Sequence, residues 1–191
     1  MADNAGIRSR SEIRGEEFRT LPETLVQRFG TRDPFRLAEQ LGFIVRFINT
    51  RNQKGFCREV LGHFFIFINR NLSEAMQRMC CAHEIGHILL HREYLSDPAY
   101  LMHMELFDMR SRTEYEANLF AASLLVDDED LADYLRSGAE LVDVASSLQV
   151  NVNMIALKLA ETKKRENLPI DLPFTPERKF LGRIDDRADA I

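Results

Sequence analysis

The chain has 191 residues, of which 45% are hydrophobic and 29% are charged, a balance that is ordinary for one soluble globular domain. The formal net charge of −5 argues against a broad nucleic-acid-binding surface, because such surfaces are basic. The three cysteines make no secreted disulfide framework, and the N-terminal segment lacks the apolar core of a signal peptide. We therefore expect a cytoplasmic protein that does not enter a membrane.

Two helices are expected before any strand. Apolar residues recur at helical spacing from Phe18 to Phe29, and Gly30 ends this helix. A second helix begins with Asp33 as N-cap and Pro34 in the first helical position, and it ends near Gly42. The polar residues 1–15 are predicted to form a flexible N-terminus.

Three short β-branched and aromatic segments follow, at residues 43–48, 56–60 and 63–69. Turn residues separate the first segment from the second. These segments predict a small, mainly antiparallel sheet. Together with the surrounding helices they indicate an α+β fold that is mainly helical.

Two further helices carry the most informative residues. The first begins at Ser73, a good N-cap, and continues to about His91. The second spans residues 113–125, where apolar positions again recur at helical spacing. Between them, residues 96–111 are irregular and rich in methionine, with room for a short helix.

The C-terminal part predicts a small helical subdomain. Asp127 caps a helix over 129–136, and residues 141–165 form two helices with a tight turn near 149–151, which resembles helix-turn-helix spacing. Its lysines come late in the second helix, whereas DNA binding needs contact residues early, so direct nucleic-acid binding is not favoured. Packing on the preceding domain, or docking a substrate, fits better. Residues 167–191 are predicted to be a flexible tail.

The segment His83-Glu84-Ile85-Gly86-His87 has the HExxH pattern of zinc hydrolases. Residues four apart lie on one face of a helix, one turn above the other, so both imidazoles can bind one metal ion. Glu84 faces the same site and is the candidate general base, which takes a proton from the attacking water and passes it to the leaving amine. The alternative is that the two histidines are merely polar residues on a half-buried helix.

A catalytic zinc site takes three protein ligands, and the helix over 113–125 offers Glu114 and Glu116 for the third. Glu114 is preferred because Asn118 lies four residues later on the same face. From there its side-chain carbonyl can accept a hydrogen bond from a ligand histidine. Glu116 stays open as the alternative. Two imidazoles and a carboxylate would also accept manganese or iron in place of Zn²⁺.

The sequence leaves other roles open. A metallopeptidase needs a donor that stabilises the oxyanion, and Tyr94, Tyr100 and His103 are candidates among which nothing in the sequence selects. His91 continues the metal-binding face but is expected to be structural. Cys80 is expected to be buried and inert rather than a ligand or a redox switch.

Four blocks of residues resemble the ImmA/IrrE-type metallopeptidases. They are Asp33-Pro34-Phe35, residues 64–69, residues 82–91 and residues 114–125, and the likeness spans roughly residues 16–160. The resemblance implies a gluzincin-like α+β domain, which we expect over 16–138, and the helical subdomain described above is expected over 139–166. It also implies His83, His87 and Glu114 as ligands of one zinc ion, with Glu84 as general base. Members of this family cut, or otherwise inactivate, helix-turn-helix repressors of mobile elements or stress responses.

Three functions are therefore weighed. The first is a zinc-dependent endopeptidase of narrow specificity that cleaves a regulatory protein, namely a helix-turn-helix repressor, and so acts as an anti-repressor. The alternative is a non-proteolytic regulator that contains zinc and antagonises its repressor partner by binding. The third, DNA binding through residues 141–165, is the weakest because the chain is acidic.

Overall fold

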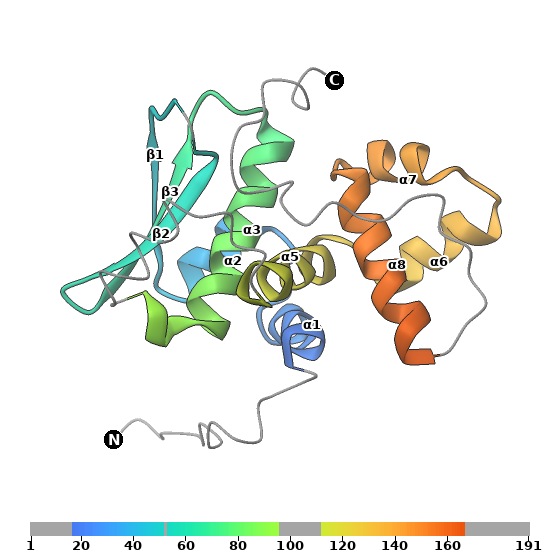
Figure 1. Ribbon diagram of the computed structural model, residues 1–191, viewed down its shortest axis with the longest axis horizontal. Coiled ribbons are helices and arrows are strands. Elements are labelled where there is room, and N and C mark those ends of the chain that lie inside the picture. Colours follow the sequence, from blue (N-terminus) through green and yellow to red (C-terminus); the bar gives the residue numbers. More distant parts are fainter. Residues whose placement is uncertain (1–16, 52, 96–111, 167–191) are drawn as a thin grey trace.

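The computed structural model describes residues 17–51, 53–95 and 112–166 (Figure 1). The elements in chain order are α1 (Glu17–Phe29), α2 (Pro34–Gln40), β1 (Ile44–Ile48), β2 (Gly55–Val60), β3 (His63–Asn69), α3 (Glu74–Leu90), the 3-10 turn η1 (Arg92–Tyr94), α5 (Arg112–Leu125), α6 (Asp128–Arg136), α7 (Leu141–Leu148) and α8 (Val152–Glu166). This confirms a mainly helical α+β architecture. The predicted flexible ends and the irregular segment 96–111 lie outside the described residues.

The helix starts follow the local signals in the sequence. The side chain of Asp33 accepts a hydrogen bond from the Phe35 N–H, and that of Ser73 accepts one from the Met76 N–H. Asp127 likewise accepts from the first N–H groups of α6. These bonds satisfy donors that have no partner within a helix, so each cap fixes where its helix begins.

The sheet is mixed, so the prediction of a mainly antiparallel sheet is wrong. The strand order is β1-β3-β2, with β2 antiparallel to β3 and β1 parallel to β3. A tight turn at Leu61 and Gly62 joins β2 to β3, and β3 then lies between the other two strands. Because β1 and β2 run in opposite directions, and β3 reverses the direction of β2, β3 runs parallel to β1. That pairing depends on strand order, which strand propensity does not reveal.

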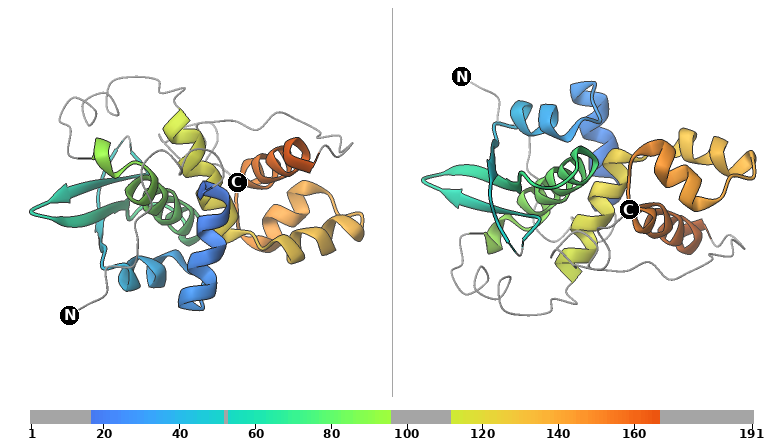
Figure 2. Two further views of the ribbon diagram at one scale, coloured as in Figure 1. Left: turned by 90° about the horizontal axis from the view of Figure 1, so that it is seen from below. Right: turned by 90° about the horizontal axis from the view of Figure 1, so that it is seen from above.

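Helix α3 is the centre of the fold. All ten residues from Met79 to Ile88 are buried, so this stretch is covered on every side. The sheet and α2 pack on α3, α5 crosses it, and α1 packs on α5 (Figures 1 and 2). A helix buried all round can hold polar groups away from bulk water, and His83, Glu84 and His87 lie in this stretch.

The C-terminal helices lie on the opposite side of α5 from the sheet (Figure 2). Val144, Met154 and Ile155 belong to the same hydrophobic core as α3 and α5. The predicted turn between two helices is present, with Gln149 in the left-handed region at φ 54°. The helix-turn-helix-like character of this part, and its boundary at residue 139, stay predictions. No helix in the described ranges is long and apolar enough to cross a membrane.

Candidate metal centre

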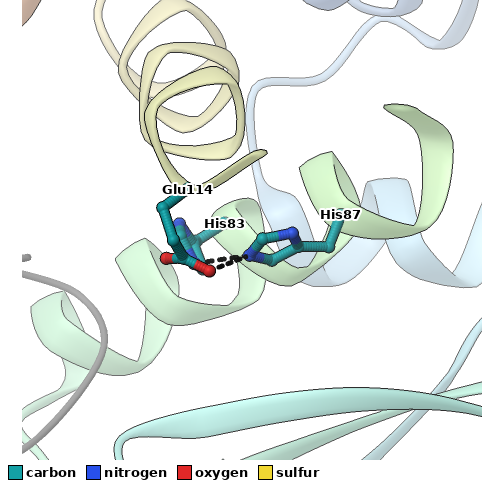
Figure 3. Close-up of side chains that lie close together, drawn as sticks. All are labelled: His83, His87 and Glu114. Carbon is teal, nitrogen blue, oxygen red and sulfur yellow. Dashed lines mark hydrogen bonds and ion pairs between the residues drawn. The ribbon is translucent and has the colours of Figure 1, made fainter. Parts of the chain in front are cut away.

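His83, His87 and Glu114 converge between α3 and the first turn of α5 (Figure 3). The Nε2 atoms of His83 and His87 lie 3.0 Å apart. The Glu114 carboxylate lies 3.4 Å from His83 Nε2 and 3.1 Å from His87 Nε2. The structure therefore brings together the three side chains that the sequence nominated as metal ligands.

A close helix crossing delivers Glu114 to the histidines. Gly86 lies between the two histidines in sequence, and a Cβ atom on it would stand 3.2 Å from the Ala117 main chain and 3.2 Å from the Phe120 ring. A Cβ atom at this distance would be a tight contact, so glycine favours the close approach of α3 and α5. The glycine inside the HExxH pattern thus has a packing role.

The donor set fits a divalent metal ion. Two donors that each lie ~2.0–2.1 Å from a tetrahedral zinc ion are roughly 3.4 Å apart. The separations of 3.0, 3.1 and 3.4 Å are close to that value. Moreover, two ring nitrogens 3.0 Å apart repel one another unless a proton or a cation lies between their lone pairs. A metal ion would satisfy all three groups at once.

The charges of His87 and Glu114 also favour a bound cation. Burial by itself lowers the pKa of His87, but the Glu114 carboxylate more than compensates, so the net shift is upward. Burial would raise the pKa of Glu114, yet His87 and His83 hold it well below its usual range. The carboxylate is thus ionised and attracts positive charge, whether a proton on imidazole or a bound cation.

Glu116, the alternative third ligand, lies elsewhere. Its carboxylate is 2.5 Å from Arg112 Nε and 3.6 Å from His91 Nε2. His91 is buried and also interacts with the Thr113 main chain, and its pKa is lowered to about 4, mainly by burial. His91 therefore ties the end of α3 to the start of α5 and is not among the three converging groups.

The comparison with known proteins agrees with this geometry. Residues 38–160 match the family model of the IrrE N-terminal-like domain, peptidase family M78. The chain belongs to this family. It is also 30% identical over 143 residues to "Uncharacterized immunity region protein 2" of Bacillus phage phi105, across 74% of this chain and 89% of that protein. The family supports a metallopeptidase-like domain, and the matched range includes all three converging residues.

The role predicted for Asn118 is not realised in this arrangement. Asn118 is buried and lies one turn after Glu114 on α5. However, the Nδ1 atoms of His83 and His87 make no hydrogen bond to any described residue, so the expected bond from a histidine to the Asn118 side chain is not formed.

Glu84 is buried beside the sheet, and its hydrogen-bond partner there was not predicted from the sequence. The Cys57 thiol on β2 donates a hydrogen bond to its carboxylate. A Cβ atom on Gly55, two residues earlier, would lie 3.6 Å from Glu84 Oε1. Gly55 and Cys57 share one face of a strand, and this period of two was the signal available in the sequence. Cys80 is buried, as predicted.

The predicted oxyanion donors stay predictions. Tyr100 and His103 lie outside the described residues, and so does the side chain of Tyr94. Glu84 and the three converging groups are therefore the chemistry that this structure describes for a member of the M78 family.

Proposed function

We propose that this chain is a zinc-dependent endopeptidase of narrow specificity that cleaves a cytoplasmic regulatory protein, a helix-turn-helix repressor. The observation that carries the proposal is the convergence of His83, His87 and Glu114 within a family of peptidases. Two imidazoles and one carboxylate leave a tetrahedral metal ion one position for substrate or water, as catalytic zinc sites require.

His83 and His87 would bind the ion through Nε2, and Glu114 would bind it through its carboxylate. When bound, zinc acts as a Lewis acid that polarises water and the scissile carbonyl. The two ligand helices are held together by buried packing, which keeps the donor atoms in place without large rearrangement. Glu114 supplies the single negative charge of the ligand set.

Glu84 is the proposed general base. It is next to His83 on α3, is buried, and its Oε2 atom makes no hydrogen bond to any described residue. In the proposed reaction, Oε2 accepts a proton from the attacking water and donates it to the leaving amine. A carboxylate with one oxygen not engaged by the protein suits this transfer.

A regulatory substrate is supported by context. The relative in Bacillus phage phi105 is named as a protein of an immunity region. Members of the ImmA/IrrE-type family, which this chain resembles, cut or otherwise inactivate repressors. A protease that acts on one repressor needs a docking surface besides its active centre, and the α6–α8 part is the proposed place for it.

The test is co-expression with a candidate helix-turn-helix repressor from the same genome. Wild type should yield repressor fragments of defined size on a gel, whereas Glu84→Gln should yield intact repressor. The purified Glu84→Gln variant should still bind one zinc ion, because Glu84 is not one of the converging groups. Fragments at an undiminished rate with Glu84→Gln, or a wild type that binds no metal ion, would refute the proposal.

The same experiment decides the alternative, a non-proteolytic regulator that contains zinc. In that case Glu84→Gln would relieve repression as well as wild type does, with the repressor intact. A reporter gene under the repressor's control, measured beside the gel, separates these two outcomes.

A further inference from the structure

The strand β2 places two unusual residues against the candidate general base. Gly55 and Cys57 are two residues apart in this strand, so their side-chain positions lie on the same face, which is the face toward α3. A Cβ atom on Gly55 would lie 3.0 Å from the Phe67 carbonyl oxygen and 3.6 Å from the Cys80 Cβ atom. The same Cβ atom would lie 3.6 Å from Glu84 Oε1, an ordinary contact distance, so this part of β2 lies directly against the face of α3 that carries Glu84.

The contact between Cys57 and Glu84 is buried on both sides. Cys57 is 2% exposed and Glu84 is 4% exposed. Burial, and then the nearby charge of Glu84, raise the pKa of the Cys57 thiol well above its usual range. The thiol thus stays protonated and remains a hydrogen-bond donor.

We propose that Cys57 is a positioning residue, whose S–H group holds one oxygen of Glu84 so that the other faces the reacting water. Glu84 Oε2 makes no hydrogen bond to the described residues, so the thiol engages the other oxygen, which is also the one nearest Gly55. This inference rests on the proposed function, because it assigns Glu84 its part in peptide hydrolysis.

A thiol suits this task because it is a weak donor. A strong donor, such as a guanidinium or ammonium group, would stabilise the ionised carboxylate and make it a poorer base. A weak donor fixes the orientation of the carboxyl group at little cost to its basicity. An apolar neighbour would leave the carboxylate without a hydrogen bond and free to rotate.

The kinetic test compares three variants. Cys57→Ala removes the donor, Cys57→Ser keeps an O–H donor, and Cys81→Ala is the matched control, since Cys81 is equally buried and has only a longer-range electrostatic interaction with Glu84. We expect kcat to fall about tenfold in Cys57→Ala with KM unchanged, to recover largely in Cys57→Ser, and to stay near wild type in Cys81→Ala. Equal kcat in Cys57→Ala and Cys81→Ala would overturn the inference.

An infrared test needs no activity. The S–H stretching band of Cys57 is identified as the band that disappears in Cys57→Ser. Replacing the charged acceptor in Glu84→Gln should weaken the hydrogen bond and move this band to higher wavenumber, whereas the Cys81 band should not move. A stationary Cys57 band would overturn the inference. A wild type that cleaves no protein would refute the proposed function instead, and the infrared result would still decide whether the thiol holds the carboxylate.

Discussion

Arg32, which lies just before α2, forms an ion pair with Asp127, the N-cap of α6, at 2.5 Å. The same guanidinium donates to the main-chain oxygens of Ser123 and Leu124 at 3.3 and 3.2 Å and pairs with Glu23 at 2.6 Å. It therefore provides hydrogen-bond donors for carbonyl groups at the C-terminal end of α5, where the helix dipole makes positive charge favourable. One side chain joins α1, α5 and α6.

Arg32→Met should lower the free energy of unfolding by roughly 1–3 kcal/mol, because it leaves two carbonyls and the carboxylates of Asp127 and Glu23 without this donor. The loss should lie below the upper end of this range, because the Arg32 side chain is 24% exposed and solvent weakens its ion pairs. Arg136→Met is the control, because Arg136 and its partner Asp133 are both largely exposed. Its effect should stay within about 0.5 kcal/mol. Urea unfolding measures both, and equal effects would contradict this account.

Gly86 should control metal affinity through the distance between α3 and α5. The series Gly86→Ala, Gly86→Ser and Gly86→Val adds volume at a position where a Cβ atom would lie 3.2 Å from the Ala117 main chain. Overpacking of about 1–3 kcal/mol outweighs the gain in helix propensity of at most about 1 kcal/mol from glycine to alanine. Zinc affinity, measured by competition with a chelator, should fall in order of side-chain volume. Wild-type affinity in Gly86→Val would exclude this role.

Glu114 and Glu116 give a matched pair for the third ligand. Glu114→Gln should weaken zinc binding by at least about 100-fold, more than the loss of an outer hydrogen-bond partner usually does. Glu116→Gln should change it by less than about tenfold, since Glu116 faces Arg112 and His91 instead. Titration of each apoprotein with zinc against a chelator gives the comparison. The reverse order of affinities would transfer the ligand role to Glu116.

The tip of the β2–β3 hairpin carries removable strain. Leu61 is 95% exposed and has φ 51°, followed by Gly62 at φ 78°. Leucine in the left-handed region costs about 1–2 kcal/mol, whereas asparagine tolerates it better. Leu61→Asn should therefore raise the free energy of unfolding by about 0.5–1 kcal/mol. Gly62→Ala, the opposite change in the same turn, should lower it, and urea midpoints of both variants test the pair.

The sequence predicted those features that depend on nearby residues. The caps Asp33, Ser73 and Asp127 act within one turn of their own helices, so they located the helix starts. The parallel pairing of β1 with β3 was missed because it depends on the order of strands, which only the folded chain defines. For the same reason the contact of Cys57 with Glu84 was missed, whereas the pair His83 and His87 followed from helical spacing alone.

The position of the last two helices limits what a deletion can reveal. Met154 shares its hydrophobic surroundings with Phe120 of α5, and the Asn151 N–H donates to Met79 Sδ at 3.1 Å. A chain that ends between α6 and α7 would therefore lack the residues that pack against α5. Such a deletion would disturb the metal centre as well as any recognition surface. Such a deletion would mimic a lost docking site. Point changes on the outer face of α7, at Val142 for example, which is 63% exposed, would separate recognition from folding.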